Sequence, residues 1–153
     1  MSQFSDAIYT LHNNPFVLTP LIVNFYQDMR PQPNNLLLAY LTLPLLLYVP
    51  SRDFLTTAKI TSSLHTFNSK KERLFGIQDR VAHYKTITNI CLQHALNNGY
   101  LTVNSDMSVK WNKTFDNQIE SLSIAYKASK NVHKIFRDRD LIEIYQFLGI
   151  HQL

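Results

Sequence analysis

The chain has 153 residues, of which 45% are hydrophobic and 17% are charged, and its net charge is +4. This length fits one domain with an ordinary core. The low share of charged residues favours a subunit of a larger complex, because exposed apolar patches usually mark partner sites. The single cysteine, Cys91, excludes an internal disulfide and fits a reducing, cytoplasmic setting.

The first predicted helix begins after Asn14. Residues 1–6 contain neither a basic residue nor an apolar run, so we expect no secretory signal. Asn14 suits the N-cap and Pro15 the first helical position, where the missing N–H costs little. The helix should run to about Met29 with one apolar face, made of Phe16, Leu18, Leu21, Ile22, Phe25 and Met29.

An apolar run of 14 residues from Leu36 to Val49 follows. It predicts a central helix from Leu36 to about Tyr48, kinked or cut short by Pro44, and it is shorter than the ~20 residues that span a membrane. We expect a turn at Pro50 with a new N-cap at Ser51 and a short helix from Asp53 to about Ile60. A further helix should begin near residues 61–63, with two residues facing inward: Leu64 and Phe67.

Two apolar stripes predict helix from Leu74 to Gly99, as one helix or as two that break near Tyr84. The stripes are formed by Leu74, Ile77, Val81 and Tyr84, and then by Ile87, Ile90, Cys91, His94, Ala95 and Leu96. Gly99 marks the stop. The pattern then changes to a β-hairpin from Tyr100 to Trp111, and a helix that runs directly into a hairpin is typical of a winged helix-turn-helix.

The C-terminal part returns to helix. We expect a helix from Asp116 to about Lys130, lined by Ile119, Leu122, Ile124 and Tyr126, then a basic stretch, and a last helix from Leu141 to Leu148 that Gly149 closes. The predicted fold is mainly α, with a winged-helix core and one hairpin. A single domain covers 1–153, with helical parts at about 1–70 and 116–153 and the winged-helix-like part at about 71–115.

Nothing in the sequence indicates catalysis. The six histidines are scattered, the serines lack a nucleophile elbow, and no carboxylate pair stands out. Cys91 and His94 lie on an apolar stripe, so we interpret both as core residues and not as a nucleophile and a metal ligand. We therefore expect no enzyme activity, no cofactor, no metal and no small-molecule substrate.

Basic residues leave a nucleic-acid surface open. The predicted recognition helix from Thr86 to Asn98 carries no arginine, which argues against sequence-specific reading. Phosphate binding needs several Lys and Arg side chains acting together. The alternative interpretation is that these residues form a solvent-exposed basic face that binds no nucleic acid. The candidates are Lys70, Lys71 and Arg73, the hairpin residues Lys110 and Lys113, and the later group of Lys127, Lys130, Lys134, Arg137 and Arg139.

Aromatic residues outside the main stripes suggest a partner surface, because aromatic side chains often anchor interfaces. The alternative is that they complete a small core. They are Phe4, Tyr9, Trp111, Phe115 and Phe136.

The chain resembles the middle component of three-component ABC systems over nearly its whole length. The resemblance is carried, in order, by Ile8-Tyr9, Asn13-Asn14-Pro15-Phe16-Val17-Leu18-Thr19-Pro20-Leu21, Leu41-Thr42-Leu43-Pro44-Leu45-Leu46-Leu47, Arg52, Leu55, Tyr100-Leu101 and Ile144-Tyr145-Gln146-Phe147-Leu148-Gly149-Ile150. Residues 128–133 depart from the family pattern, which has a Gly-containing turn and an aromatic pair there. The shared motif places Asn14, Pro15, Phe16 and Arg52 at structural or interface positions.

What the resemblance implies is an accessory subunit of a Lamassu-type bacterial defence system. Such a subunit accompanies an SMC-like ABC ATPase that senses foreign DNA and a nuclease-type effector that it helps to hold inactive. The resemblance also implies a winged-helix core and only indirect or weak contact with DNA. It implies no contact with a membrane. The alternative that the residues leave open is a freestanding winged-helix DNA-binding regulator; a toxin or membrane-active role comes third.

Overall fold

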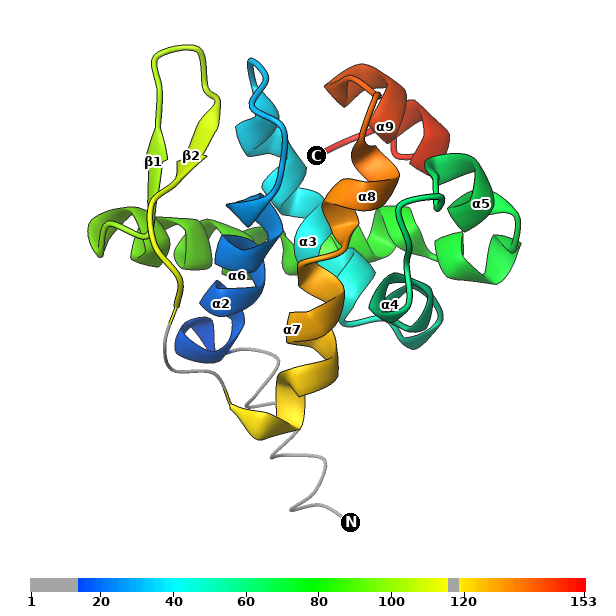
Figure 1. Cartoon of the computed structure of the whole chain (residues 1–153), viewed down its shortest axis with the longest axis horizontal. Coiled ribbons are helices and arrows are strands. Elements are labelled where there is room, and N and C mark those ends of the chain that lie inside the picture. The colour runs from blue at the N-terminus through cyan, green and yellow to red at the C-terminus, as the bar shows by residue number, and fades with distance from the viewer. Residues whose placement is uncertain (1–13, 116–118) are drawn as a thin grey trace.

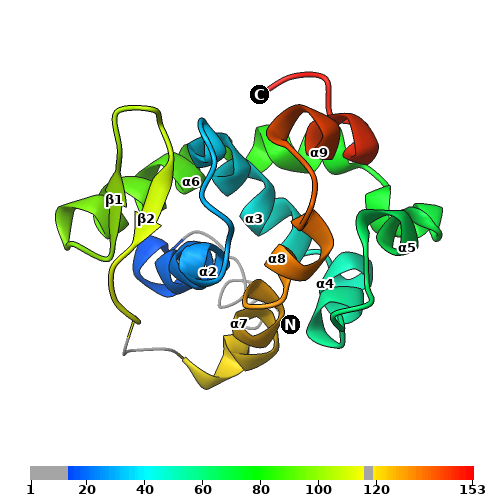
Figure 2. The same ribbon diagram turned by 45° about the horizontal axis from the view of Figure 1, so that its top comes forward.

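Three helices cross at the centre of the molecule: α2 (Pro15–Gln27), α3 (Ala39–Leu46) and α6 (Ile77–Asn97). The computed structural model describes residues 14–115 and 119–153. A hairpin lies at one end, with α5 (Leu64–Asn68) at the other (Figures 1 and 2). The central helices hold most of the fully buried leucines, which explains why the apolar run forms the core.

α2 begins as predicted. The Asn14 side chain accepts a hydrogen bond from the Phe16 backbone N–H at 3.0 Å, and Pro15 occupies the first turn. The prediction of a single apolar face is wrong, because every residue from 18 to 26 is buried while the Phe16 side chain is 66% exposed. α2 is therefore a central helix enclosed on all sides, and it ends two residues before Met29.

The apolar run forms the 3-10 turn η1 (Asn35–Leu38) and then α3. Residues 41–46 are all buried, so the predicted central helix is confirmed. Pro44 lies inside α3, which ends two residues later at Leu46. Among the described residues, no helix is long and apolar enough to cross a bilayer.

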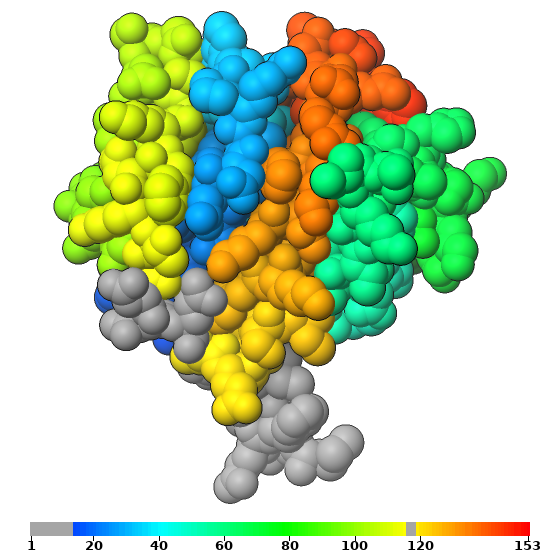
Figure 3. All heavy atoms as spheres, in the orientation of Figure 1, coloured from blue at the N-terminus to red at the C-terminus, as the bar shows by residue number. Residues whose placement is uncertain are grey.

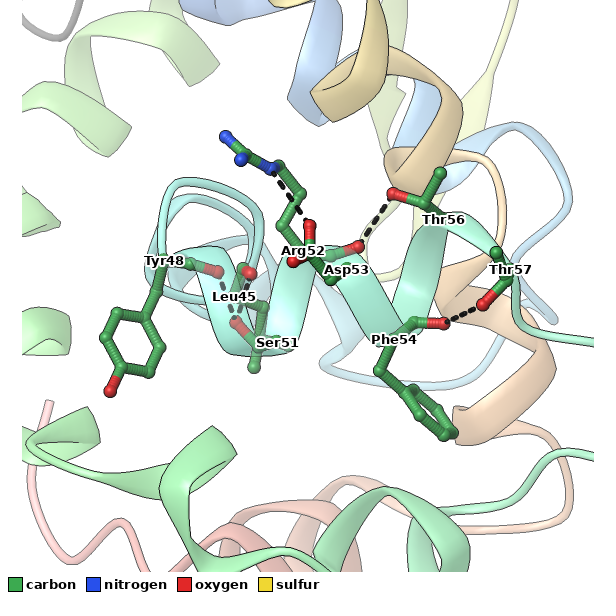
Figure 4. Close-up of polar contacts among 8 residues, drawn as sticks. All are labelled: Leu45, Tyr48, Ser51, Arg52, Asp53, Phe54, Thr56 and Thr57. Carbon is green, nitrogen blue, oxygen red and sulfur yellow. Dashed lines mark hydrogen bonds and ion pairs between the residues drawn. The ribbon is translucent and has the colours of Figure 1, made fainter.

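The predicted N-cap at Ser51 is wrong. α4 (Val49–Thr56) already begins at Val49 with Pro50 in its first turn, where proline suits a helix start. The buried Ser51 hydroxyl instead donates to the carbonyl oxygens of Leu45 and Tyr48 and ties α4 to the end of α3 (Figure 4). The helix ends at Thr56, before the predicted end near Ile60.

α5 follows the prediction closely. Ser63 caps it through a capping box with Thr66, and both Leu64 and Phe67 are fully buried. A 3-10 turn, η2 (Lys71–Leu74), then leads into α6.

α6 is one continuous helix, so no break occurs near Tyr84. Its buried face includes Cys91 and Ala95 as predicted, but Ile90 is exposed and Leu92 is buried in its place. The helix stops at Asn97, and Gly99 adopts the left-handed conformation with φ of 74°.

The predicted hairpin is confirmed. Strands β1 (Leu101–Val103) and β2 (Val109–Trp111) pair antiparallel, with Leu101 opposite Trp111. Backbone hydrogen bonds from residues 34 and 36 reach the carbonyls of Asp106 and Met107, so the segment before α3 lies along the hairpin turn. The described chain is mainly helical with one hairpin, and its assignment as a winged helix stays a prediction.

The C-terminal part consists of short helices: η3 (Glu120–Leu122), α7 (Ser123–Ser129), α8 (Val132–Phe136) and α9 (Leu141–Leu148). The start predicted at Asp116 lies outside the described residues. Ile124 is 53% exposed, so its predicted inward position is wrong, and the small residues Ala125 and Ala128 are buried against the core instead. Gly149 closes α9 as predicted.

Candidate partner-binding site

An apolar groove lies between η1, α9 and the C-terminal residues. We call it the α9 groove. It has a volume of about 320 Å³ and is lined by Leu37, Leu141, Ile142, Tyr145, Gln146, Ile150, His151, Gln152 and Leu153. A groove of this size and composition suits apolar side chains of a partner.

α9 has apolar residues on two faces. Asp140 caps it by accepting a hydrogen bond from the Glu143 N–H at 2.8 Å, and Ile144 and Leu148 pack into the core. Ile142 points away from that core and is 67% exposed. Because a helix needs one apolar face to pack on its own domain, the second face is available to another surface.

The floor of the groove is fixed by a tyrosine. The Tyr145 hydroxyl donates to the Leu37 carbonyl at 2.5 Å and joins α9 to η1. Burial raises the pKa of Tyr145 well above its ordinary value, so the hydroxyl keeps its proton and this bond at neutral pH.

The C-terminal wall is held by one side chain of α6. The Gln78 amide oxygen accepts from the His151 N–H at 2.7 Å, and its nitrogen donates to the Gln152 carbonyl at 2.8 Å. Ile150 is buried at the turn after Gly149. The tail is therefore ordered beside α9, where Leu153 adds a further exposed apolar side chain.

The predicted motif at the start of α2 lies elsewhere, against the second half of α6. The Phe16 ring meets the His94 ring edge-on at 4.9 Å, and the Cys91 thiol lies 3.8 Å from the Pro15 carbonyl oxygen. Asn14 and Pro15 thus have a structural role as helix start, while Phe16 offers an exposed aromatic surface.

Arg52 lies on α4, next to Asp53 (Figure 4). Its Nε lies 4.0 Å from a carboxylate oxygen of Asp53, and its side chain is 27% exposed. The Nε atom is buried and has no hydrogen-bond partner. Arg52 is therefore weakly held by its own domain, and its interface role stays a prediction.

The other predicted aromatic anchors divide into two groups. Phe115 and Phe136 are buried, so they complete the core and are not interface anchors. Trp111 is half-buried beside the end of α2. Phe4 and Tyr9 lie outside the described residues.

Several of the predicted basic contacts already serve the fold. Arg73 stacks over the Phe54 ring at 4.3 Å and Arg139 over Phe147 at 4.4 Å. Lys134 donates to the Ala58 carbonyl at 3.1 Å, and Arg137 donates to the Ile60 carbonyl. The bonds of Lys134 and Arg137 hold α8 and the loop after α4 together, so these two cations already have partners within the chain.

The remaining basic candidates belong to η2, β2 and α7 and to residues close to these elements. Lys113 lies 4.8 Å from the centre of the Tyr100 ring. The others, all exposed, are Lys70, Lys71, Lys110, Lys127 and Lys130.

The predicted recognition helix uses several of its polar side chains internally. Thr88 is buried, Gln93 bonds to Asn97 at 2.8 Å, and Asn89 accepts from the Tyr40 hydroxyl at 2.5 Å. Few polar groups on this half of α6 are left to read base edges.

The buried thiol has no features of a nucleophile. Cys91 is fully buried, and burial raises its pKa to about 11, so it is protonated at neutral pH. Within residues 14–115 and 119–153 no three His, Cys, Asp or Glu side chains form a metal-binding group.

The α9 groove was not predicted from the sequence. Its one signal in the sequence is the pair Leu141-Ile142, which places apolar residues on both faces of the last helix. Gln78, which fixes the tail, lies 73 residues away from His151 and could not be paired with it by local pattern.

The family model described as ABC-three component (ABC-3C) system Middle Component 3 matches residues 1–152. No curated protein and no solved structure matches the chain.

Proposed function

This chain belongs to the Middle Component 3 family of ABC-three component systems, and from that membership we propose that it is a non-catalytic adaptor subunit. Membership makes it one part of a multi-protein ABC system, as the resemblance predicted. The finer assignment in our proposal is a Lamassu-type bacterial defence complex.

In this proposal the chain sits between two partners. An SMC-like ABC ATPase senses foreign DNA, and a nuclease-type effector acts on it. The adaptor joins the two and helps to hold the effector inactive until the ATPase responds.

The α9 groove is the observation that carries the proposal. Its lining includes three exposed apolar side chains: Leu37, Ile142 and Leu153. Exposed apolar surface on a small domain generally marks a partner site, and its burial stabilises a complex by about 25 cal/mol per Å² before the costs of association.

The alternative, a freestanding winged-helix DNA-binding regulator, has less support. Arg73, Lys134 and Arg137 bond to carbonyls of their own domain, and the half of α6 from Thr86 onward lacks arginine. DNA binding depends on several free cations acting together.

Co-purification tests the proposal. The chain, tagged and co-expressed with the ATPase and effector of its own system, should recover both. Ile142→Asp should lower recovery of one partner at least about tenfold, because it places a charge in an apolar contact. Ile124→Asp is the matched control, since Ile124 is also an exposed helical isoleucine but lies on α7. Recovery of the chain alone, with DNA affinity that falls steeply with salt, would favour the regulator.

A further inference from the structure

Two hollows flank the segment that leaves α2. The hairpin hollow has a volume of about 590 Å³ and is lined by Tyr26, Gln27, Asp28, Met29, Arg30, Pro31, Asn104, Val109, Lys110 and Trp111. The α8 hollow, of about 250 Å³, is lined by Asp28, Met29, Arg30, Gln32, His133, Phe136 and Arg137. Figure 3 shows the blue segment after α2 running between the hairpin and α8 on one face of the molecule.

The two hollows carry excess positive charge. Arg30 lines both, Lys110 lines the first and Arg137 the second, while Asp28 is the one acidic residue among their lining residues. Burial lowers the pKa of His133, so this residue adds little charge at neutral pH. The ion pairs within the described chain are Arg52–Asp53 and Arg139–Glu143, so Arg30, Lys110 and Arg137 have no carboxylate partner there.

The hairpin hollow also has unsatisfied polar groups in its walls. The Trp111 indole N–H and the Gln27 amide oxygen are both buried without a hydrogen-bond partner. An unpaired buried donor or acceptor costs about 1–3 kcal/mol. Met29 and Val109 add apolar side chains to the lining of the same hollow.

We propose that this paired hollow docks an acidic segment of a partner protein in the complex, an inference that rests on the adaptor function proposed above. Carboxylates of the segment meet Arg30, Lys110 and the part of Arg137 not bonded to Ile60, and its apolar side chains enter the hairpin hollow. Concave sites of 250–590 Å³ fit individual side chains. A DNA duplex would present phosphates to the same cations, so a duplex forms a separate arm of the test below.

Trp111 provides a direct readout because it is the sole tryptophan of the chain. The intact protein is titrated with an acetylated eight-residue peptide that alternates Glu and Leu, followed to about 1 mM peptide. We expect a saturable change in Trp111 emission. The same peptide with Gln in place of Glu should bind at least about tenfold more weakly, because it lacks the charge.

Paired charge reversals locate the site. Arg30→Glu with Lys110→Glu should weaken peptide binding at least about tenfold. Lys59→Glu with Lys71→Glu makes the same change in net charge at exposed residues outside the hollows and should bind as the parent does. Thermal melting of both variants verifies that each remains folded.

Three results would overturn the inference: no emission change with the Glu-Leu peptide, unaltered binding by the Arg30 and Lys110 variant, or a response to a 20-base-pair duplex in place of the peptide. The adaptor function fails separately, when co-purification recovers neither partner. Recovery of both partners together with an unchanged Trp111 spectrum would contradict the docking site and leave the adaptor function supported.

Discussion

Gln78 binds the backbone of Gln152 in both directions. Its amide nitrogen donates to the Gln152 carbonyl at 2.8 Å, and its oxygen accepts from the Gln152 N–H at 3.3 Å as well as from His151. One side chain of α6 thus orders the last residues of the chain, and with them one wall of the α9 groove.

Replacing Gln78 should release this wall without unfolding the domain. We expect Gln78→Ala to speed amide exchange at His151 and Gln152 and to cost about 1 kcal/mol in the free energy of unfolding, since the bonds are exposed. Gln93→Ala, on the same helix, is the control and should leave exchange at residues 151–152 unchanged. Hydrogen exchange followed by mass spectrometry measures both.

Arg80 is a central contact between α6 and its neighbours. Its guanidinium donates to the Pro44 carbonyl at 3.2 Å and to the carbonyls of Arg73 and Phe75, and it stacks over the Tyr48 ring at 3.7 Å. Arg80→Met should lower the free energy of unfolding by about 2 kcal/mol, because it leaves part-buried carbonyls unpaired. Arg80→Lys should recover less than half of that loss, since an ammonium lacks the planar fork.

Urea denaturation of the Arg80 variants measures this loss. Lys85→Met removes a cation from an exposed position on the same helix and should change stability by less than about 0.5 kcal/mol. Equal losses in Arg80→Met and Lys85→Met would show that charge alone matters.

The Asn14 cap should stabilise α2 measurably. Asn14→Ala removes the acceptor for the Phe16 N–H and should cost about 1 kcal/mol. Asn14→Asp keeps a side-chain oxygen at the cap and should stay within about 0.5 kcal/mol of the parent. Equilibrium unfolding in urea distinguishes the two, and equal stability of all three proteins would contradict a capping role.

Cys91 should make stability depend on pH in the alkaline range. Burial raises the thiol pKa from 9.0 to about 11, so folding favours the protonated form. Below pH 9 the protonated thiol makes its full contribution to the free energy of unfolding. This contribution is lost as the pH rises from 9 towards 11, and the loss is on the order of 2–3 kcal/mol. Because buried tyrosines also titrate there, the difference between the parent and Cys91→Ser isolates the thiol.

The Cys91 comparison has two readouts. Unfolding free energies at pH 8 and 10.5 should differ more in the parent than in Cys91→Ser. At pH 7.5 a thiol-reactive disulfide reagent should modify the parent slowly when folded and rapidly in urea. Fast modification of the folded protein would show that the thiol is accessible.

Local chemistry made several elements predictable. The Asn14 cap, the helix start near residues 61–63, the glycine stop at Gly99 and the hairpin all depend on residues within a few positions of one another, and the structure confirms them. The prediction of Ser51 as an N-cap was wrong because Pro50 and Ser51 fit a turn and a helix start equally well. The contact that decided it, a hydroxyl bonded to Leu45, depends on how α3 ends.

Burial was harder to predict than secondary structure. Ile90 and Ile124 satisfied a helical stripe and are exposed, whereas Phe115 and Phe136 fell outside the stripes and are buried. A stripe defines a face of a helix but not what packs against it. In a domain of short helices, each helix meets several neighbours at different angles, so the buried face follows the neighbours.

The sequence by itself determined a helical domain with one hairpin, a central apolar helix and membership of a three-component ABC family. Those features follow from composition, period and ordered motifs, which are local or additive along the chain. Only the tertiary structure placed Gln78 against the C-terminal tail, and Arg30 and Lys110 around a shared hollow. These pairs are distant in sequence, and the packing of the core alone brings them together.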